Sequence, residues 1–137
     1  MELQHNSLHE LEDIMRTMPQ MELQTDHYFA DGMYARVLFR PAGTLIVGKV
    51  HKKEHFYIIA KGCVQVGKEV YKAGTVIVSS PGTKRAVLAL EDSICMTIHR
   101  TKKRNLDKIE RKLIEPDAKA LFNAENKLKV KELTCLG

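Results

Sequence analysis

A long run of short β-type segments constrains the fold of this chain more than any other feature of its sequence. Between residues 21 and 100, stretches rich in valine, isoleucine, tyrosine, phenylalanine and threonine alternate with breaks such as "ADG", "PAG", "KAG" and "SSPG". Many short strands at close spacing are typical of an antiparallel barrel or sandwich. The predicted strands are 21–24, 33–40, 44–50, 55–60, 63–66, 69–71, 75–79, 85–90 and 93–99.

A short amphipathic helix is predicted on each side of this region. In residues 7–18, "SLHELEDIMRTM", apolar residues recur at helical intervals, and Ser7 with Glu10 has the spacing of a capping box. The pattern is helical again in residues 105–114, where Asn105 is the predicted N-cap. The β-rich region is therefore expected to carry two short helices at its flanks.

The chain is expected to form a single domain with three parts. Its 137 residues are enough for one hydrophobic core and too few for two. A weaker amphipathic stretch, 117–133, follows Pro116, which breaks the preceding helix. The parts are an N-terminal helical segment 1–20, a β-barrel 21–100 and a C-terminal helical segment 101–137.

Composition narrows the class of protein. Hydrophobic residues make up 44% and charged residues 28%, so a folded domain is expected rather than a disordered chain. No apolar run reaches the roughly 20 residues that span a bilayer, and the acidic start "MELQHNSLHELED" is unlike a signal peptide. A cytoplasmic protein without membrane contact is expected. Its cysteines are expected to stay reduced because they are odd in number and form no CxxC pair: Cys63, Cys95 and Cys135.

The charge is unevenly distributed along the chain. The net charge is +5, yet the first 35 residues carry one basic and seven acidic side chains, so the remainder is basic. There is no arginine-rich run and no recognised nucleic-acid motif. The simplest interpretation of the basic remainder is a solvated helix face, and the alternative is a contact with an acidic partner. Nucleic acid is not an expected partner.

Two histidines stand four residues apart in the stretch "GKVHKKEHFYIIAKG", residues 48–62. On a helix, His51 and His55 would share a face and suggest a zinc site. The flanking segments are β-type, however, so the pair is placed at a connection between strands, and Glu54 directly precedes His55, which excludes the HExxH motif. Strand alternation sends Lys49 and His51 to the same side.

The spacing of glycines around these histidines resembles that of the cupin family, small RmlC-like β-barrels. The first cupin motif runs Gly, five residues, His, one, His, three or four, Glu, six, Gly, and its places are filled here by Gly43, Lys49, His51, His55 and Gly62. The second motif is matched more loosely by Gly74, the "SPG" turn 80–82, Arg85 and Ala89. This resemblance implies a small antiparallel jelly-roll barrel.

A second resemblance concerns the source of the chain. The stretches "ADGMYAR", "GKVHKKEH", "PGTKR" and "LDKIERKLIE" are similar to those of short cupin-like proteins encoded by tailed bacteriophages, a group without an established activity. This resemblance implies a phage accessory protein in the host cytoplasm, which sequesters a host molecule or counters host defence.

The chain departs from the cupin pattern at the places where relatives hold a metal. Metal-binding cupins offer three histidines and a carboxylate there, and this chain has Lys49, His51, His55 and Arg85. Two permanent positive charges repel a cation by several kcal/mol at an effective dielectric constant of about 20. Lysine and the arginine fork attract phosphate or carboxylate instead. The first hypothesis is therefore a cationic barrel pocket for an anionic ligand such as a nucleotide or a phosphorylated sugar.

The residues predicted to bind this ligand are Lys49, His51, His55, Tyr57, Arg85 and His99. No cofactor and no catalysis are required by this hypothesis. A divalent metal on His51 and His55 is the alternative, and it needs a third ligand, for which His99 is the first candidate and Glu54 the next. Under a second hypothesis the chain is an enzyme: His51 or His55 is the general base of an isomerase, epimerase or lyase, or a metal supports a dioxygenase.

Each candidate residue also has a purely structural interpretation. The two histidines could bond to nearby backbone or to Tyr57, Lys49 could reach the barrel rim, and Arg85 could pair with Glu91 or Asp92. His27, near "FADG", could lie at the pocket rim. A third functional hypothesis is an assembly module, and a homodimer is expected because open sheet edges favour pairing.

Overall fold

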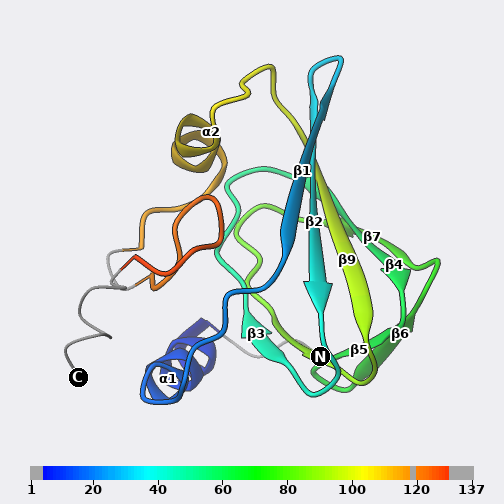
Figure 1. Ribbon diagram of the computed structural model, residues 1–137, viewed down its shortest axis with the longest axis vertical. Coiled ribbons are helices and arrows are strands. Elements are labelled where there is room, and N and C mark those ends of the chain that lie inside the picture. The colour runs from blue at the N-terminus through cyan, green and yellow to red at the C-terminus, as the bar shows by residue number, and fades with distance from the viewer. Residues whose placement is uncertain (1–4, 118–119, 130–137) are drawn as a thin grey trace.

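Two antiparallel sheets face each other in this chain (Figure 1). The computed structural model describes residues 5–117 and 120–129. The predicted mainly β fold with two short flanking helices is confirmed. In chain order the elements are α1 (His5–Met15), β1 (Thr25–Ala30), β2 (Met33–Arg40), β3 (Leu45–Val47), β4 (His55–Lys61), β5 (Cys63–Val66), β6 (Glu69–Lys72), β7 (Val76–Ser79), β8 (Ala86–Ala89), β9 (Ser93–Arg100) and α2 (Leu106–Leu113).

The strand order is that of a jelly roll. One sheet has the order β1-β2-β9-β4-β7 and the other β3-β8-β5-β6. From β2 onward the first strand pairs with the last, the second with the second last, and so on, until β5 pairs with β6. This is one long antiparallel ribbon rolled into two sheets, which is the fold that the cupin resemblance implies.

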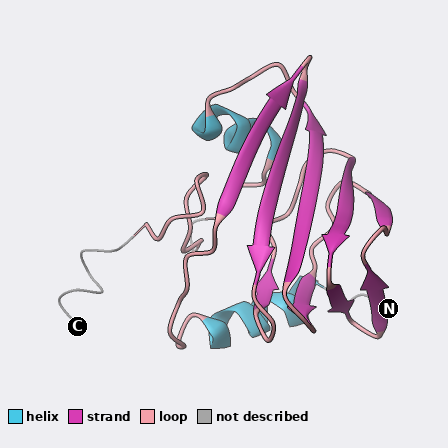
Figure 2. Ribbon diagram, turned by 45° about the vertical axis from the view of Figure 1, so that its right-hand side comes forward, coloured by secondary structure: helices cyan, strands magenta, loops and turns pink. Residues whose placement is uncertain are grey.

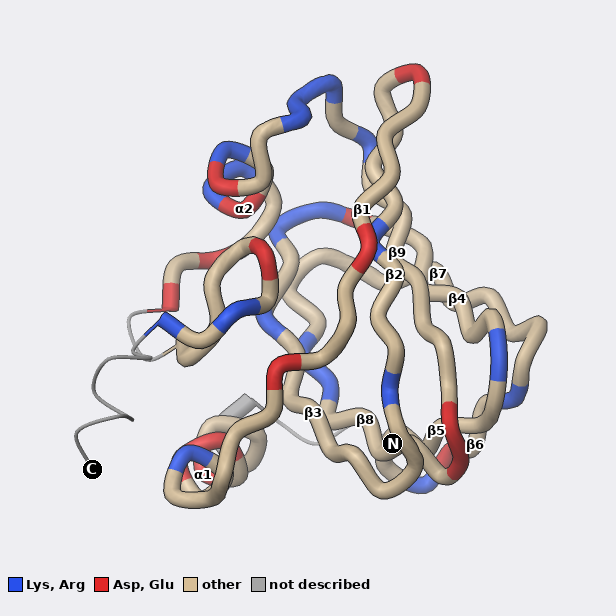
Figure 3. The backbone as a smooth tube through the Cα atoms, viewed as in Figure 1, with Lys and Arg blue, Asp and Glu red and all other residues tan. Residues whose placement is uncertain are grey.

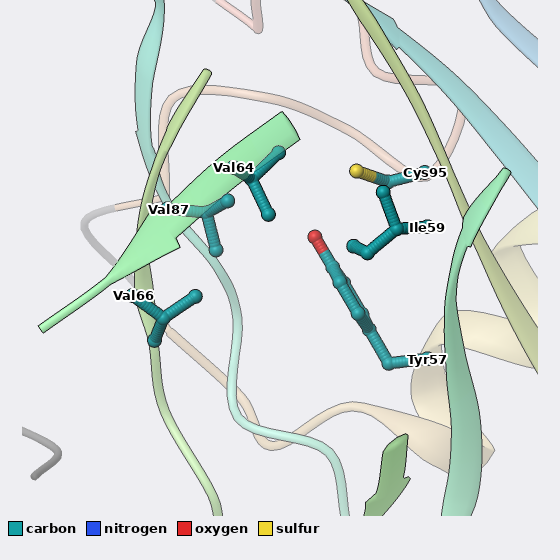
Figure 4. Close-up of a cluster of buried hydrophobic side chains, with 6 residues drawn as sticks. All are labelled: Tyr57, Ile59, Val64, Val66, Val87 and Cys95. Atoms are coloured by element: carbon teal, nitrogen blue, oxygen red, sulfur yellow. The ribbon is translucent and has the colours of Figure 1, made fainter. Parts of the chain in front are cut away.

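The barrel core lies between the two sheets, at the end of the barrel away from α2. Alternate residues of β4, β5, β8 and β9 point inward because strand side chains alternate between the two faces. Figure 4 shows this cluster, with the Tyr57 ring among the aliphatic side chains. Its buried members are Tyr57, Ile59, Val64, Val66, Val87 and Cys95. The core fills one end of the barrel and leaves the other end to α2.

Helix α2 closes this second end. Its apolar face, with Ile109 and Leu113 buried, packs on Tyr34 of the five-stranded sheet. The Asn105 side chain accepts a hydrogen bond from the backbone N–H of Lys108, so the predicted N-cap is confirmed. After the helix, Glu115 N–H donates to the Val50 carbonyl at 2.9 Å, which ties the segment to the loop before β4.

Three element predictions are wrong. Residues 21–24 form no strand, and the first strand is β1 at Thr25–Ala30. Helix α1 already includes Ser7, so this residue is not its N-cap. Of the amphipathic stretch 117–133, residues 118–119 and 130–133 lie outside the described residues, and the remainder forms turns with a Phe122–Leu128 bridge in place of a helix.

The described helices are short. Within residues 5–117 and 120–129, none is long and apolar enough to cross a bilayer.

Candidate metal and ligand site

Three histidines from three parts of the chain meet at the α2 end of the barrel. His55 begins β4 and His99 lies near the end of β9, and these strands are neighbours with Phe56 opposite Ile98. Both imidazoles point inward, with 7% and 4% of the residue exposed. His51 comes from the loop before β4, which is held by a bridge to Ile114 after α2 and by a 2.9 Å hydrogen bond from Gly82 N–H to the His51 carbonyl.

The three imidazole rings are in mutual contact. Their centroids are 4.3 Å apart for His51 and His55, 4.3 Å for His55 and His99, and 4.8 Å for His51 and His99. His51 Nδ1 lies 2.8 Å from His99 Nε2, so one nitrogen donates a hydrogen bond to the other. One ring nitrogen from each histidine lies within 4.8 Å of the other two. The sequence prediction that His99 is the third member of the group therefore agrees with their placement.

The surroundings keep all three imidazoles neutral. Burial lowers the pKa of His51 to about 2, helped by the neighbouring His55 and His99 and by Arg36 and Arg85. Burial likewise lowers the pKa of His99 to about 3, with further contributions from His55 and Arg36. For His55 burial lowers the pKa, a hydrogen bond to the Lys53 carbonyl raises it, and Arg85 lowers it. Neutral imidazole is the form that binds a metal.

The histidine cluster fits a divalent transition metal. Nitrogen ligands suit zinc, copper, nickel or iron, and three protein ligands plus an open position are typical of a non-structural zinc site. His99 Nδ1 is buried and has no hydrogen-bond partner among the described residues. Ligand nitrogens in a tetrahedral site lie about 3.3 Å apart, closer than the present spacing of up to 4.8 Å. The three rings would therefore have to turn out of their stacked arrangement to hold one metal ion.

A pocket adjoins the cluster under α2. It encloses about 430 Å³, including its open mouth, between the inner face of β2 and β9, the loop before β4, and α2 with the segment that follows. His51 and His99 form part of its wall together with Tyr34 and Arg36. A ligand in this pocket would therefore contact the histidines directly.

Lys49 lines the pocket, as predicted, but its charge is compensated. Its Nζ forms an ion pair with the Glu110 carboxylate of α2 and donates to the Phe122 carbonyl at 2.9 Å. Both charged side chains are about one quarter exposed. This contact ties the helix to the barrel and leaves less positive charge for a ligand than the sequence predicts.

Sequence reasoning missed Arg36 as a pocket residue. On β2 it pairs in register with Thr97 of β9, so it points inward beside the His99 position. Its Nε is buried without a hydrogen-bond partner in the described part of the chain. Burial lowers the pKa of Arg36, while Tyr34 and Glu110 raise it. The alternation of β2 could have identified it, because Tyr34 and Arg36 share one face of a strand that was predicted correctly.

Three predicted ligand residues do not line this pocket: His55, which belongs to the histidine cluster, Arg85 and Tyr57. Arg85 Nη1 donates to Ser79 Oγ at 2.8 Å, beside the histidines, where it lowers the pKa values of His51 and His55. Tyr57 belongs to the core, and Figure 4 shows its hydroxyl among aliphatic side chains. Burial raises the pKa of Tyr57. His27 lies near the pocket, with its Nδ1 2.7 Å from the Tyr34 hydroxyl oxygen.

Comparisons with known proteins found similar solved structures only. No family model and no curated protein matches the sequence. Similar solved structures include an RmlC-like cupin protein from Ralstonia eutropha (19% identity, 58% of this chain and 57% of that chain, TM-score 0.49). Others are an acetylacetone dioxygenase from Acinetobacter johnsonii (14%, 57% and 59%, 0.49) and KdgF from Halomonas sp. (16%, 60% and 81%, 0.49). The chain spans less than two thirds of the first two of these proteins.

Proposed function

We propose that this chain binds a divalent transition metal through His51, His55 and His99 and holds a small anionic ligand in the adjoining pocket. The observation that carries the proposal is the convergence of three neutral, largely buried imidazoles, with one nitrogen of each within 4.8 Å of the others. The metal, when bound, supplies a Lewis acid and a positive charge for an oxygen ligand.

The charges around the cluster favour an anion beside the metal. Arg36 and Arg85 are close enough to lower the pKa of His51, so a bare divalent cation would be repelled by both. A carboxylate or phosphate group in the pocket would offset this repulsion and could accept hydrogen bonds from the buried Arg36 guanidinium. The ligand class is therefore a small organic anion such as a nucleotide or a sugar phosphate.

A general-base enzyme is less well supported. An efficient base has a pKa near the working pH, and the pKa values of about 2 for His51 and about 3 for His99 are far below it. These imidazoles are neutral but weakly basic. A metal-dependent enzyme stays an alternative, because a metal held by the three histidines could also support catalysis. The dioxygenase activity of one similar solved structure belongs to that protein.

The biological setting rests on the sequence resemblance to phage cupin-like proteins. Binding without turnover suits an accessory protein that sequesters a host molecule in the host cytoplasm. Detection of the chain during infection and a change in a host nucleotide pool on its deletion would support this role.

Metal binding is tested with untagged protein titrated with Co²⁺, whose visible absorption reports nitrogen coordination. One equivalent is expected to bind. His99→Gln is expected to weaken binding at least about tenfold, because loss of even a hydrogen-bond partner of a metal ligand has an effect of about this size. His9→Gln is the matched control, because His9 lies on α1 and is 56% exposed at its side chain. Equal affinity in the His99→Gln variant would remove the proposed site.

The anion is tested by calorimetry with inorganic phosphate, AMP and glucose 6-phosphate, with and without Zn²⁺. Arg36→Gln is expected to weaken binding at least about tenfold, since a buried charge-assisted hydrogen bond is lost. Arg85→Ala tests the residue predicted from sequence. Lys61→Gln is the control, because this exposed residue at the end of β4 is outside the pocket. No binding by any of the three probes would reject this part of the proposal.

A further inference from the structure

The outer face of the five-stranded sheet is apolar. Ladder register arranges its outward side chains in rows that cross all five strands. One row consists of Val78, Phe56, Ile98, Ala35 and Tyr28, and the next of Val76, Ile58, Met96, Val37 and Asp26. We call these ten residues the outer rows. Every member except Asp26, on the edge strand β1, is apolar or aromatic.

The usual polarity of a sheet is reversed at the end of this sheet that lies near α2. An antiparallel sheet normally turns apolar side chains to the core and polar ones to water. In this sheet the inward positions near α2 are polar and belong to the candidate site, with His55, His99 and Arg36 among them. Of the outer rows, Val37 is buried, at 9% exposed, and the other nine members are partly or fully exposed, so another explanation is needed for their composition.

The outer rows are accessible in the described part of the chain. Four members have about half of their surface exposed: Phe56 at 48%, Val78 at 57%, Val76 at 58% and Tyr28 at 58%. Helix α2 packs on Tyr34, an inward residue of β2. Figure 2 shows both helices behind the five strands, which lie side by side in front. A contiguous exposed apolar face of this kind marks an interaction site.

We propose that a second copy of this chain packs on the outer rows. The first reason is charge: the row positions on β2, β4, β7 and β9 carry no charged side chain, so a partner chosen by charge would find nothing to pair with. Figure 3 shows Lys and Arg positions in the loop before α2 and on α2 itself, and others along the strands. An uncharged apolar face is complementary to an identical face.

The second reason is size. Five strands about 4.8 Å apart, crossed by rows about 7 Å apart along the strands, cover roughly 400 Å² in projection when the Phe39–Ile94 pair is added. A standard interface buries about 800 Å² per partner, with an apolar centre and a polar rim. The outer rows match the centre of such an interface. A two-fold dimer needs only this one patch on each copy.

The proposed dimer is a face-to-face sheet packing. Aligned sheets pack about 10 Å apart with their strands about 30° from parallel. The pockets, which lie on the inner side of each sheet under α2, would face away from the interface and stay open. The contact would also fix β4 and β9, which carry His55 and His99. The proposal does not depend on the proposed function.

The test is sedimentation velocity over a micromolar concentration series. The unmodified chain is expected to sediment as a dimer, and Phe56→Glu is expected to weaken dimerisation at least about tenfold, because an aromatic anchor is replaced by a buried charge. Val76→Glu tests a second row member. Val70→Glu is the matched control, since Val70 is 50% exposed on β6 of the other sheet.

The outcomes separate the two proposals. A dimer lost in Phe56→Glu and Val76→Glu but kept in Val70→Glu, with unchanged Co²⁺ binding per chain, supports the interface. A monomer at all concentrations overturns it, whether or not that monomer binds Co²⁺ or associates with phosphatidylcholine vesicles. A dimer unaffected by both row variants also overturns it.

Discussion

At the scale of single residues, the buried histidine cluster costs the fold part of its free energy of unfolding. Three imidazoles share a small buried volume, and His99 Nδ1 has no hydrogen-bond partner among the described residues. A buried polar atom without a partner costs roughly 1–3 kcal/mol. The fold stabilises this arrangement only while the rings are neutral, because Arg36 and Arg85 oppose any added positive charge.

Acid is therefore expected to destabilise the chain through these histidines. The folded pKa of His99 is about 3, below its value of about 6.5 in the unfolded chain. The unfolded state then binds more protons, so the free energy of unfolding falls as pH drops below about 6.5, by about 1.4 kcal/mol per pH unit for this group. His51 steepens the decline.

Urea unfolding at pH 7 and pH 5 measures this loss. About 2 kcal/mol is expected from His99 alone over this interval. The His99→Gln variant is expected to show a shallower dependence. Equal stability of the unmodified chain at both pH values would contradict the neutral, buried state of the cluster.

Gly62 is a second residue on which the fold depends. Its φ is +83°, and a Cβ atom there would clash with Ser93 Oγ and lie 2.5 Å from the Asp92 carbonyl oxygen. Ser93 Oγ in turn accepts from Cys63 N–H. Gly62→Ala is expected to lower the free energy of unfolding by about 3 kcal/mol or more, because the neighbouring atoms are largely backbone.

Gly74→Ala is the matched control for this prediction. Its φ is +94°, yet nothing lies within 4 Å of the added Cβ. Only the left-handed backbone strain of about 1–2 kcal/mol is expected. Urea unfolding compares the two variants. Equal losses would mean that the close approach at Gly62 contributes nothing beyond its backbone conformation.

At the scale of elements, α2 determines access to the pocket. Its apolar face covers the barrel end, and its Glu110 forms the ion pair with Lys49 across the pocket wall. A pair that is still partly exposed to solvent contributes about 1 kcal/mol. Its main effect is on charge, because the carboxylate offsets the lysine within the pocket.

Glu110→Gln is expected to strengthen anion binding. The substitution removes a negative charge from the pocket lining and leaves Lys49 with the Phe122 carbonyl as partner. Calorimetry with inorganic phosphate is expected to show affinity raised about threefold to tenfold, with stability lowered by less than about 1 kcal/mol. Glu115→Gln is the control, since Glu115 is exposed and follows the helix. Unchanged phosphate affinity would show that no anion approaches Lys49.

The sequence predicts an element well where the apolar pattern follows the core. Strand 33–40 was predicted residue for residue, and the strand that pairs with it, β9, to within one residue. Strand β1 was missed because its inward positions hold His27, which contacts Tyr34 near the pocket. Polar side chains that face a site break the alternation on which strand prediction depends.

At the scale of the whole molecule, the jelly roll itself assembles the site. His51 and His99 are far apart in sequence, and no motif spacing connects them. They meet because β9 lies next to β4 in the rolled ribbon, while the loop before β4 bends back to bridge Ile114. Residue identities alone predicted the candidates, and the structure places Tyr57 in the core and Arg36 in the pocket wall.

A metal that links these distant segments is expected to stabilise the entire fold. Binding to the folded state alone raises the free energy of unfolding by RT ln(1 + [L]/Kd), about 2.7 kcal/mol at a hundredfold excess over Kd. For a domain of this size, this corresponds to a rise of roughly 10 °C in the unfolding temperature. Calorimetric melting with Zn²⁺ measures the rise, and Mg²⁺, which prefers oxygen ligands, is the control ion. Since His51, His55 and His99 belong to a loop and two strands, His99→Gln should abolish most of the shift. An equal shift with Mg²⁺, or in that variant, would mean that the stabilisation comes from surface binding and that the histidines do not join these segments through a metal.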